Sequence, residues 1–165
     1  LNKEGKIEWF VKPTIEDKAV RVQDMLLMDI ISANDWNRPI YFSTTVSEGN
    51  RIGLDNFLAP EGLVGRLCSH ECKVSPEKIY NNLTEVYTYD GVNDKHINDV
   101  EEVASIYQNY RHAFIHLVWQ YEDAGEKEKV IETLNLMDEK LPENLLPYSN
   151  EDMEKEAERL RSINL

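Results

Sequence analysis

The chain has 165 residues and carries 31 acidic against 18 basic side chains, so that its net charge is −13. With 41% hydrophobic residues, the composition is that of a folded globular protein and excludes a disordered acidic tail. The negative charge repels phosphate groups, and no basic cluster of more than two residues interrupts it, so we expect neither nucleic acid nor an anionic membrane surface as a partner.

The densest apolar run, residues 25–31, contains Asp29 and is far shorter than the roughly 18–20 residues that a membrane span needs. We therefore expect no insertion of this segment into a membrane. The chain begins at Leu1 without a charged and then apolar leader, which predicts an excised or processed piece of a longer protein.

The first half of the chain alternates strand and helix signals. Residues 6–12 have strand composition and end before Pro13. Thr14 and Asp17 form a plausible capping pair, after which apolar residues at three- and four-residue steps predict a helix over 15–34. Its expected inward stripe is Ile15, Ala19, Val22, Leu26, Ile30 and Ala33. Strands are predicted over 40–46 and 63–72, with one helical turn over 53–58.

The second half is helical. Ser75 and Pro76 predict the start of a short helix that ends near Leu83. From Asn98, a regular apolar stripe predicts a long helix that ends at Gly125. Two further helices are expected, one before Pro142 and one after Ser149.

These elements predict an α+β fold in which a small sheet with flanking helices packs on a C-terminal helical hairpin and one capping helix. The expected parts are a small α/β module, residues 1–97, and a helical module, residues 98–165, which together form one compact unit. The stripes of the last seventy residues are expected to be buried against the first hundred.

The helical hairpin is similar to a tetratricopeptide unit, whose pattern is carried here by Phe114, Leu117, Val118 and Tyr121 before the Gly125 turn, and by Val130, Leu134 and Pro142 after it. Val118, Val130 and Met137 replace the small residues that allow close helix contact, so a larger separation between the helices is expected. A single unit is not stable alone and needs support from the α/β module.

A second resemblance covers most of the chain. It lies in residues 24–29, 36–42, 53–58 and 61–63, in the helix around Tyr110 and Arg111, and in the Gly125 turn with the helix that follows. These segments resemble the C-terminal soluble region of a bacterial family of large multi-pass membrane proteins similar to protein O-mannosyltransferases, of the GT-C type.

The resemblance implies that sugar transfer from a polyprenyl-linked donor takes place in a membrane portion outside this chain. It therefore assigns no catalytic residue to this segment, and it implies a location on the periplasmic side of the inner membrane. Residues 68–72 depart from the family pattern.

Cys68, His70 and Cys72 alternate, which would direct all three to one face of a strand. Residues four apart on a strand lie roughly 13 Å from each other, too far to share a metal ion. A disulfide, two unpaired thiols and a metal site on a tighter loop remain open, and we expect no metal.

Two further groups have both a chemical and a structural interpretation. His112 and His116 share a helix face, but no Glu follows His112 as in a metalloprotease, so surface or half-buried histidines are expected. Asp29 lies in an apolar run, where burial would raise the pKa of its carboxyl, or it lies at the helix edge.

Three residues are candidates for binding: Trp36, Arg38 and Trp119. Arg38 offers a guanidinium to a carboxylate or phosphate, or it bonds backbone carbonyls, Asp35 or Asp55. Trp119 lies off the main stripe of its helix, so it is either covered by the α/β module or exposed as an anchor for a partner.

The remaining signals are weak. The last helix carries an acidic face, residues 151–158, that suits solvent or a basic partner, and Asn82-Leu83-Thr84 is a short sequon. No P-loop, dinucleotide motif or nucleophile elbow occurs in the sequence, and no cofactor is expected.

The sequence favours a non-catalytic extracytoplasmic module of a glycosyltransferase-like membrane protein, which interacts with a protein or peptide, including its own membrane portion, or positions acceptors. The alternative is a stand-alone tetratricopeptide-like adaptor that binds peptides. A small hydrolase with Asp29, Arg38 and His70 brought together is the third hypothesis.

Overall fold

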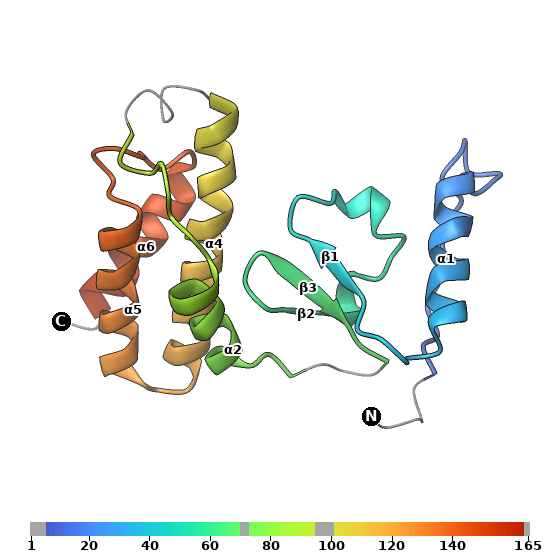
Figure 1. The fold of residues 1–165 in the computed structure, drawn as a ribbon, viewed down its shortest axis with the longest axis horizontal. Coiled ribbons are helices and arrows are strands. Elements are labelled where there is room, and N and C mark those ends of the chain that lie inside the picture. Colours follow the sequence, from blue (N-terminus) through green and yellow to red (C-terminus); the bar gives the residue numbers. More distant parts are fainter. Residues whose placement is uncertain (1–5, 70–72, 95–100, 164–165) are drawn as a thin grey trace. The chain divides into compact units, whose positions relative to one another are not determined.

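The computed structural model describes residues 6–69, 73–94 and 101–163 (Figure 1). The chain divides into two compact units, Leu1–Val74 (unit 1) and Ser75–Leu165 (unit 2). The described residues contain one three-stranded antiparallel sheet and five α-helices, so the predicted α+β class is confirmed. The module boundary predicted at 97/98 lies outside the described residues, and the observed division comes earlier, at 74/75.

Unit 1 opens with an extended segment that pairs with no strand. Residues 6–12 form no ladder, so the predicted strand is wrong, although alternate side chains do turn inward. Ile7, Trp9 and Val11 pack against the core, and the indole nitrogen of Trp9 donates to the carbonyl of Ile52 at 3.1 Å. Side-chain contacts, and not backbone pairing with a strand, therefore hold residues 6–12 against the core of unit 1.

Helix α1 spans Val22–Asn34 and begins seven residues later than the predicted start at 15. Glu16 and Asp17 adopt positive φ angles of 46° and 55°, which a right-handed helix excludes, and the amides of Thr14 and Ile15 donate instead to the carbonyl of Ala19. The predicted capping pair therefore does not form. The helix ends at Asp35, whose φ is 44°.

The sheet has the order β1-β3-β2 and consists of short strands, β1 at Tyr41–Ser43, β2 at Leu58–Pro60 and β3 at Val64–Leu67. Both pairings are antiparallel, with Phe42 opposite Gly65 and Ala59 opposite Arg66. Two 3₁₀ turns, η1 at Glu48–Asn50 and η2 at Asp55–Phe57, connect β1 to β2. The strands predicted over 40–46 and 63–72 are thus present but shorter, and residues 70–72 lie outside the described part.

The core of unit 1 joins helix, sheet and loop residues: Ile31, Phe42, Ile52, Leu54 and Leu67. Gly53 lies within the loop that supplies two of them and has a φ of 80°. A Cβ at this position would meet the carbonyl oxygen of Phe10 at 3.0 Å, so glycine is required both by the backbone angle and by the close approach of residues 6–12.

Unit 2 begins with helix α2, Pro76–Asn81, capped as predicted by Ser75, whose hydroxyl accepts from the amide of Lys78. The helix continues into a π-helical turn, η3, at Asn82–Val86. Ile79 and Leu83 are buried, and both elements pack on α4. The residues after η3 approach the same helix, because the rings of Tyr87 and Tyr89 meet the ring of Tyr110 edge-on.

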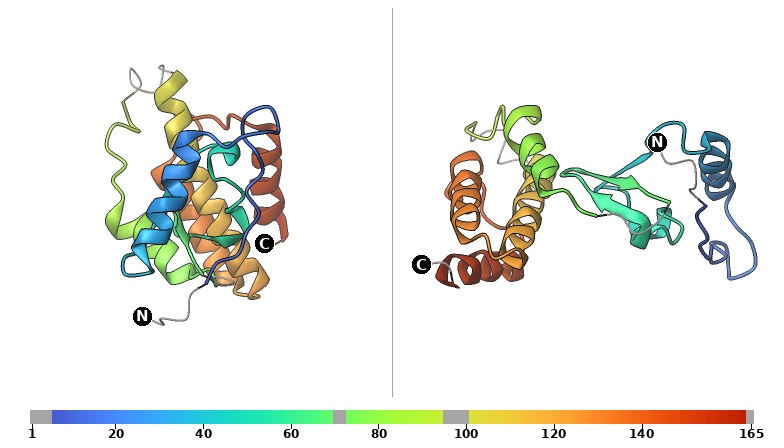
Figure 2. Two further views of the ribbon diagram at one scale, coloured as in Figure 1. Left: turned by 90° about the vertical axis from the view of Figure 1, so that its right-hand side faces the viewer. Right: turned by 90° about the horizontal axis from the view of Figure 1, so that it is seen from below.

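Helices α4 (Glu101–Asp123) and α5 (Lys127–Lys140) form the predicted hairpin, with Gly125 at a φ of 73° in the turn. The residues of the predicted hairpin pattern that precede Pro142 are all buried: Phe114, Leu117, Val118, Tyr121, Val130 and Leu134. Helix α6 (Glu151–Ile163) packs on α5. Figures 1 and 2 place α2 and α6 on opposite sides of the α4–α5 pair, so unit 2 has three helical layers.

A buried arginine fixes the connection between α5 and α6. Arg111 is 1% exposed, and its guanidinium donates to the carbonyls of Leu141 at 3.0 Å and Leu146 at 2.7 Å. It also lies 4.1 Å from the centre of the Tyr148 ring. The loop is thus bonded to α4 through its backbone. Among the helices described, none is long and apolar enough to cross a membrane.

Candidate protein-interaction site

A buried carboxylate sets the orientation of α1. Asp24 is 2% exposed and receives two hydrogen bonds of 2.9 Å from the Arg21 guanidinium and one of 2.6 Å from the Thr14 hydroxyl. These bonds hold the pKa of the Asp24 carboxyl below its usual value. Arg21 also donates to the carbonyl of Gly49, so the first turn of α1 is fixed to both neighbouring loops.

This orientation reverses the predicted inward stripe. Leu27, Met28 and Ile31 share the inward side of α1 with Asp24 and pack in the core of unit 1. Val22, Leu26 and Ile30, which were predicted to be buried, are exposed, as is Ile15. The expectation failed because α1 is apolar on two opposite sides, and Asp24 can satisfy its charge only at the side that meets Arg21 and Thr14.

The outward side carries four large apolar residues at helical spacing: Val22, Met25, Leu26 and Ile30. Their exposed fractions lie between 52% for Met25 and 73% for Val22. We call these four residues the α1 face. Single exposed apolar residues are normal, whereas a continuous row of four marks a surface that a partner covers.

The charge around the α1 face suits a protein partner better than a lipid surface. Helix α1 contains Asp24 and Asp29 but no Lys or Arg, and Asp29 is exposed. Interfacial membrane helices combine their apolar side with Lys and Arg. The α1 face therefore has the composition of a ridge that packs into an apolar groove of another protein.

Trp36 and Arg38, two of the predicted binding residues, follow the C-terminus of α1. Trp36 has a φ of 57° and is half-buried against the core of unit 1. Arg38 is exposed, and its side chain forms no hydrogen bond or ion pair with any residue in the described ranges. Asp55, one of its predicted partners, binds Arg51 at 2.7 Å instead. The binding role of both residues stays a prediction.

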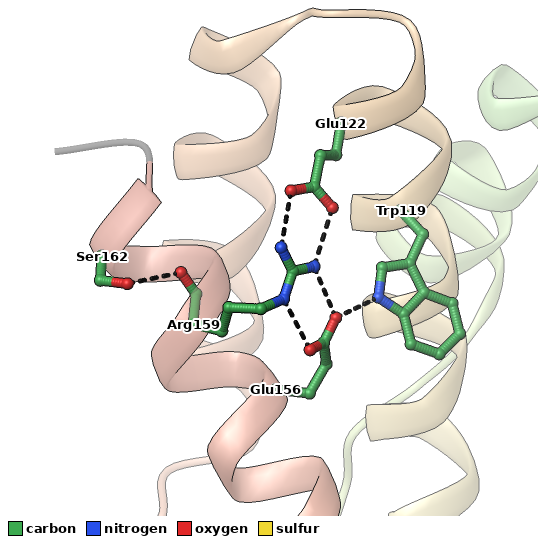
Figure 3. A network of polar contacts seen from close by, with 5 residues as sticks. All are labelled: Trp119, Glu122, Glu156, Arg159 and Ser162. Atoms are coloured by element: carbon green, nitrogen blue, oxygen red, sulfur yellow. Dashed lines mark hydrogen bonds and ion pairs between the residues drawn. The ribbon is translucent and has the colours of Figure 1, made fainter.

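Trp119, the third candidate, lies in unit 2 and is 41% exposed. Its indole nitrogen donates to Glu156 at 2.7 Å, and Arg159 binds the same carboxylate through two nitrogens (Figure 3). Arg159 also binds both oxygens of Glu122 at 3.0 and 2.9 Å. The polar atom of Trp119 thus joins α4 to α6, and a binding role for the rest of the ring stays a prediction.

The remaining candidates are the cysteine segment, the two histidines of α4 and the sequon. Cys68 is disulfide-bonded, which removes it as a thiolate ligand, while His70 and Cys72 lie outside the described residues. His112 is exposed and His116 half-buried, in agreement with the sequence. Burial lowers the pKa of the His116 ring, and partial desolvation together with the positive charge of Arg111 lowers that of His112. The sequon lies in η3, where the Thr84 hydroxyl donates to the carbonyl of Tyr80.

Comparison with protein families shows to which family this chain belongs. Residues 2–87, just over half of the chain, match the family model described as TMEM260-associated domain 2. The chain belongs to this family. No curated protein and no solved structure matches it.

The TMEM260-associated domain 2 covers unit 1 from its second residue, including the α1 face, Trp36 and Arg38, and it extends through α2 and η3 of unit 2. Trp119 lies outside it. The boundaries of the sequence family and of the compact unit therefore differ by the length of α2 and η3.

Sequence reasoning missed the α1 face, although a signal for it was present. Residues 22–34 hold more large apolar positions than one helix face accommodates, since both the row Val22, Leu26, Ile30 and the row Leu27, Ile31 qualify. A helix that is apolar on all sides is either buried or covered by a partner. The buried charge of Asp24 decides which row faces inward.

Proposed function

We propose that the chain is a non-catalytic extracytoplasmic module of a glycosyltransferase-like membrane protein, and that its α1 face docks on the membrane portion of that protein. The family is linked by its name to TMEM260, a protein O-mannosyltransferase. The role of the module is to brace the membrane portion and to position acceptor proteins beside it.

The α1 face is the observation that carries this proposal. It lies in the part of the chain that matches the TMEM260-associated domain 2, and its four residues are exposed together. Burial of a large aliphatic side chain contributes about 1.5–3 kcal/mol, so four such residues supply a substantial part of a stable interface. The partner we propose is an apolar groove formed by the loops of the membrane portion.

The disulfide at Cys68 supports the extracytoplasmic location. Disulfides persist in oxidising compartments such as the periplasm and the endoplasmic reticulum lumen, whereas the cytosol keeps thiols reduced. A periplasmic location of the module is accordingly part of the proposal.

Sugar transfer tests the proposal in two ways. The complete protein in its native membrane is assayed for transfer from a polyprenyl-linked sugar to an acceptor protein, as wild type, as Leu26→Glu and as Asn135→Glu. Asn135 is an exposed residue of α5, so its substitution adds the same charge elsewhere. We expect Leu26→Glu to lower transfer at unchanged protein level and Asn135→Glu to leave it unchanged.

The isolated chain is the second arm of this experiment. We expect it to transfer no sugar under conditions in which the complete protein is active. Transfer by the isolated chain would overturn the non-catalytic assignment, and full activity of the Leu26→Glu protein would overturn the role of the α1 face.

A further inference from the structure

A pocket of about 250 Å³ lies among three helices of unit 2. Helix α2 contributes Glu77 and Tyr80, α4 contributes Tyr121, and α5 contributes Lys129, Glu132 and Thr133. Helix α4 packs on both α2 and α5 within a single compact unit. The pocket is therefore a feature of unit 2 alone.

Two buried side chains in the wall of the pocket have unused hydroxyl groups. Tyr121 is 6% exposed, and its hydroxyl bonds no residue in the described part of the chain. Thr133 is 1% exposed, and its hydroxyl has no hydrogen-bond partner there either. Buried polar groups are usually bonded, so each unbonded hydroxyl needs an explanation. The Thr133 oxygen is fully enclosed, whereas the Tyr121 oxygen is accessible and is the one that a ligand can reach.

The charges at the rim of the pocket favour a cation. Glu77 and Glu132 form no ion pair with any described residue, although Glu77 accepts a hydrogen bond from Ser75 at 3.2 Å. Residues 75–165 contain 20 acidic and 9 basic side chains, a net charge of −11. The pocket thus has two carboxylates at its rim in a strongly acidic unit, which disfavours an anionic ligand.

The chain itself already places one cation against the aromatic wall. The ammonium of Lys129 lies 5.0 Å from the centre of the Tyr121 ring and pairs with Glu126. Lys129 therefore marks the position where the face of Tyr121 attracts positive charge. The same ammonium is also attracted by Glu77, whereas the carboxylate of Glu132 pairs with no described residue.

We propose that this pocket binds an arginine side chain of a partner protein or peptide. A guanidinium is planar, stacks on tyrosine rings and donates in pairs to carboxylates, and it has a donor to spare for the hydroxyl of Tyr121. A lysine ammonium lacks the planar stacking surface. The site is independent of the α1 face, and either proposal can fail while the other stands.

Titration of the full chain with two short peptides tests the proposal. The probes are acetyl-Gly-Arg-Gly-amide and the same peptide with citrulline, which keeps the shape of arginine and lacks its charge. Binding is followed by the NMR signals of the Tyr80 and Tyr121 rings. We expect saturable shifts of both rings with the arginine peptide and none with the citrulline peptide.

Variants with equal charge changes distinguish binding in the pocket from general electrostatic attraction of the peptide to the acidic unit. Glu132→Gln should weaken binding about tenfold, because a charge-assisted hydrogen bond is lost, whereas Glu158→Gln on α6 should change it little. Lys129→Gln should tighten binding by removing the competing ammonium, and Lys155→Gln, also on α6, should not. The proposal is overturned if the ring signals do not shift, or if the citrulline peptide binds as tightly as the arginine peptide. It is also overturned if Glu132→Gln and Lys129→Gln change the affinity no more than their controls on α6 do.

Discussion

Asp24 is the residue on which the position of α1 depends most. It is buried, and it is bonded to Arg21 and Thr14, so its removal leaves a guanidinium and a hydroxyl without their acceptor. We expect Asp24→Asn to destabilise unit 1 at pH 7. Chemical denaturation followed by the fluorescence of Trp9 and Trp36, which pack in that unit, measures the change.

The same substitution has a predictable dependence on pH. Because the folded-state pKa of Asp24 is lowered, its contribution to stability is complete above the unfolded pKa, near 4, and is lost as the pH falls through the folded value. The difference between wild type and Asp24→Asn should therefore shrink below about pH 4. Asp29→Asn, on the exposed side of the same helix, is the control and should have little effect at either pH. A difference independent of pH would contradict the role of the Asp24 charge.

At the scale of the element, α1 offers a direct test of which side faces inward. Ile30 is 58% exposed and Ile31 is 7% exposed, although they are adjacent residues of the same type. We expect Ile31→Ala to lower the free energy of unfolding by about 2–5 kcal/mol and Ile30→Ala to change it by no more than about 0.5 kcal/mol. Equilibrium denaturation of the two variants measures both values. A larger loss of stability for Ile30→Ala than for Ile31→Ala would instead support the inward stripe predicted from the sequence.

The elements differ in how far the sequence predicts them. The α4–α5 hairpin follows from sequence because its main apolar stripe ends at glycine, and the structure buries Phe114, Leu117 and Tyr121 of that stripe. Helix α1 has two such stripes, so periodicity alone does not determine its orientation or its start. Residues 6–12 have strand composition, yet composition does not reveal that no partner strand is available to them.

The candidate site was predictable only in part. The sequence placed Trp36, Arg38 and Trp119 at an element end or off a stripe, and the structure leaves Arg38 exposed and binds Trp119 to Glu156. The pocket in unit 2 collects residues from positions 77 to 133, and such a set is recognised only after the helices are packed. The likeness of the hairpin to a tetratricopeptide unit stays a prediction.

At the scale of the whole molecule, the two units predict where the chain can be divided. Residues 75–165 form a unit of their own, whereas the family match ends at 87 and includes α2 and η3. We expect a 75–165 fragment to unfold cooperatively and an 88–165 fragment to be less stable by about 3 kcal/mol or more, because Ile79 and Leu83 no longer cover α4. Thermal unfolding followed by circular dichroism compares the two. Equal stability of the fragments would show that α2 and η3 do not belong to unit 2.

The docking of the α1 face is tested most directly by photo-crosslinking in the native membrane. A photoreactive amino acid replaces Leu26 in the complete protein, with position 135 of α5 as the control, and mass spectrometry identifies the residues joined. We predict that position 26 crosslinks to a loop of the glycosyltransferase-like membrane portion and that position 135 does not. Crosslinks from position 26 that are absent, that match the control, or that join only two copies of this chain would contradict the account.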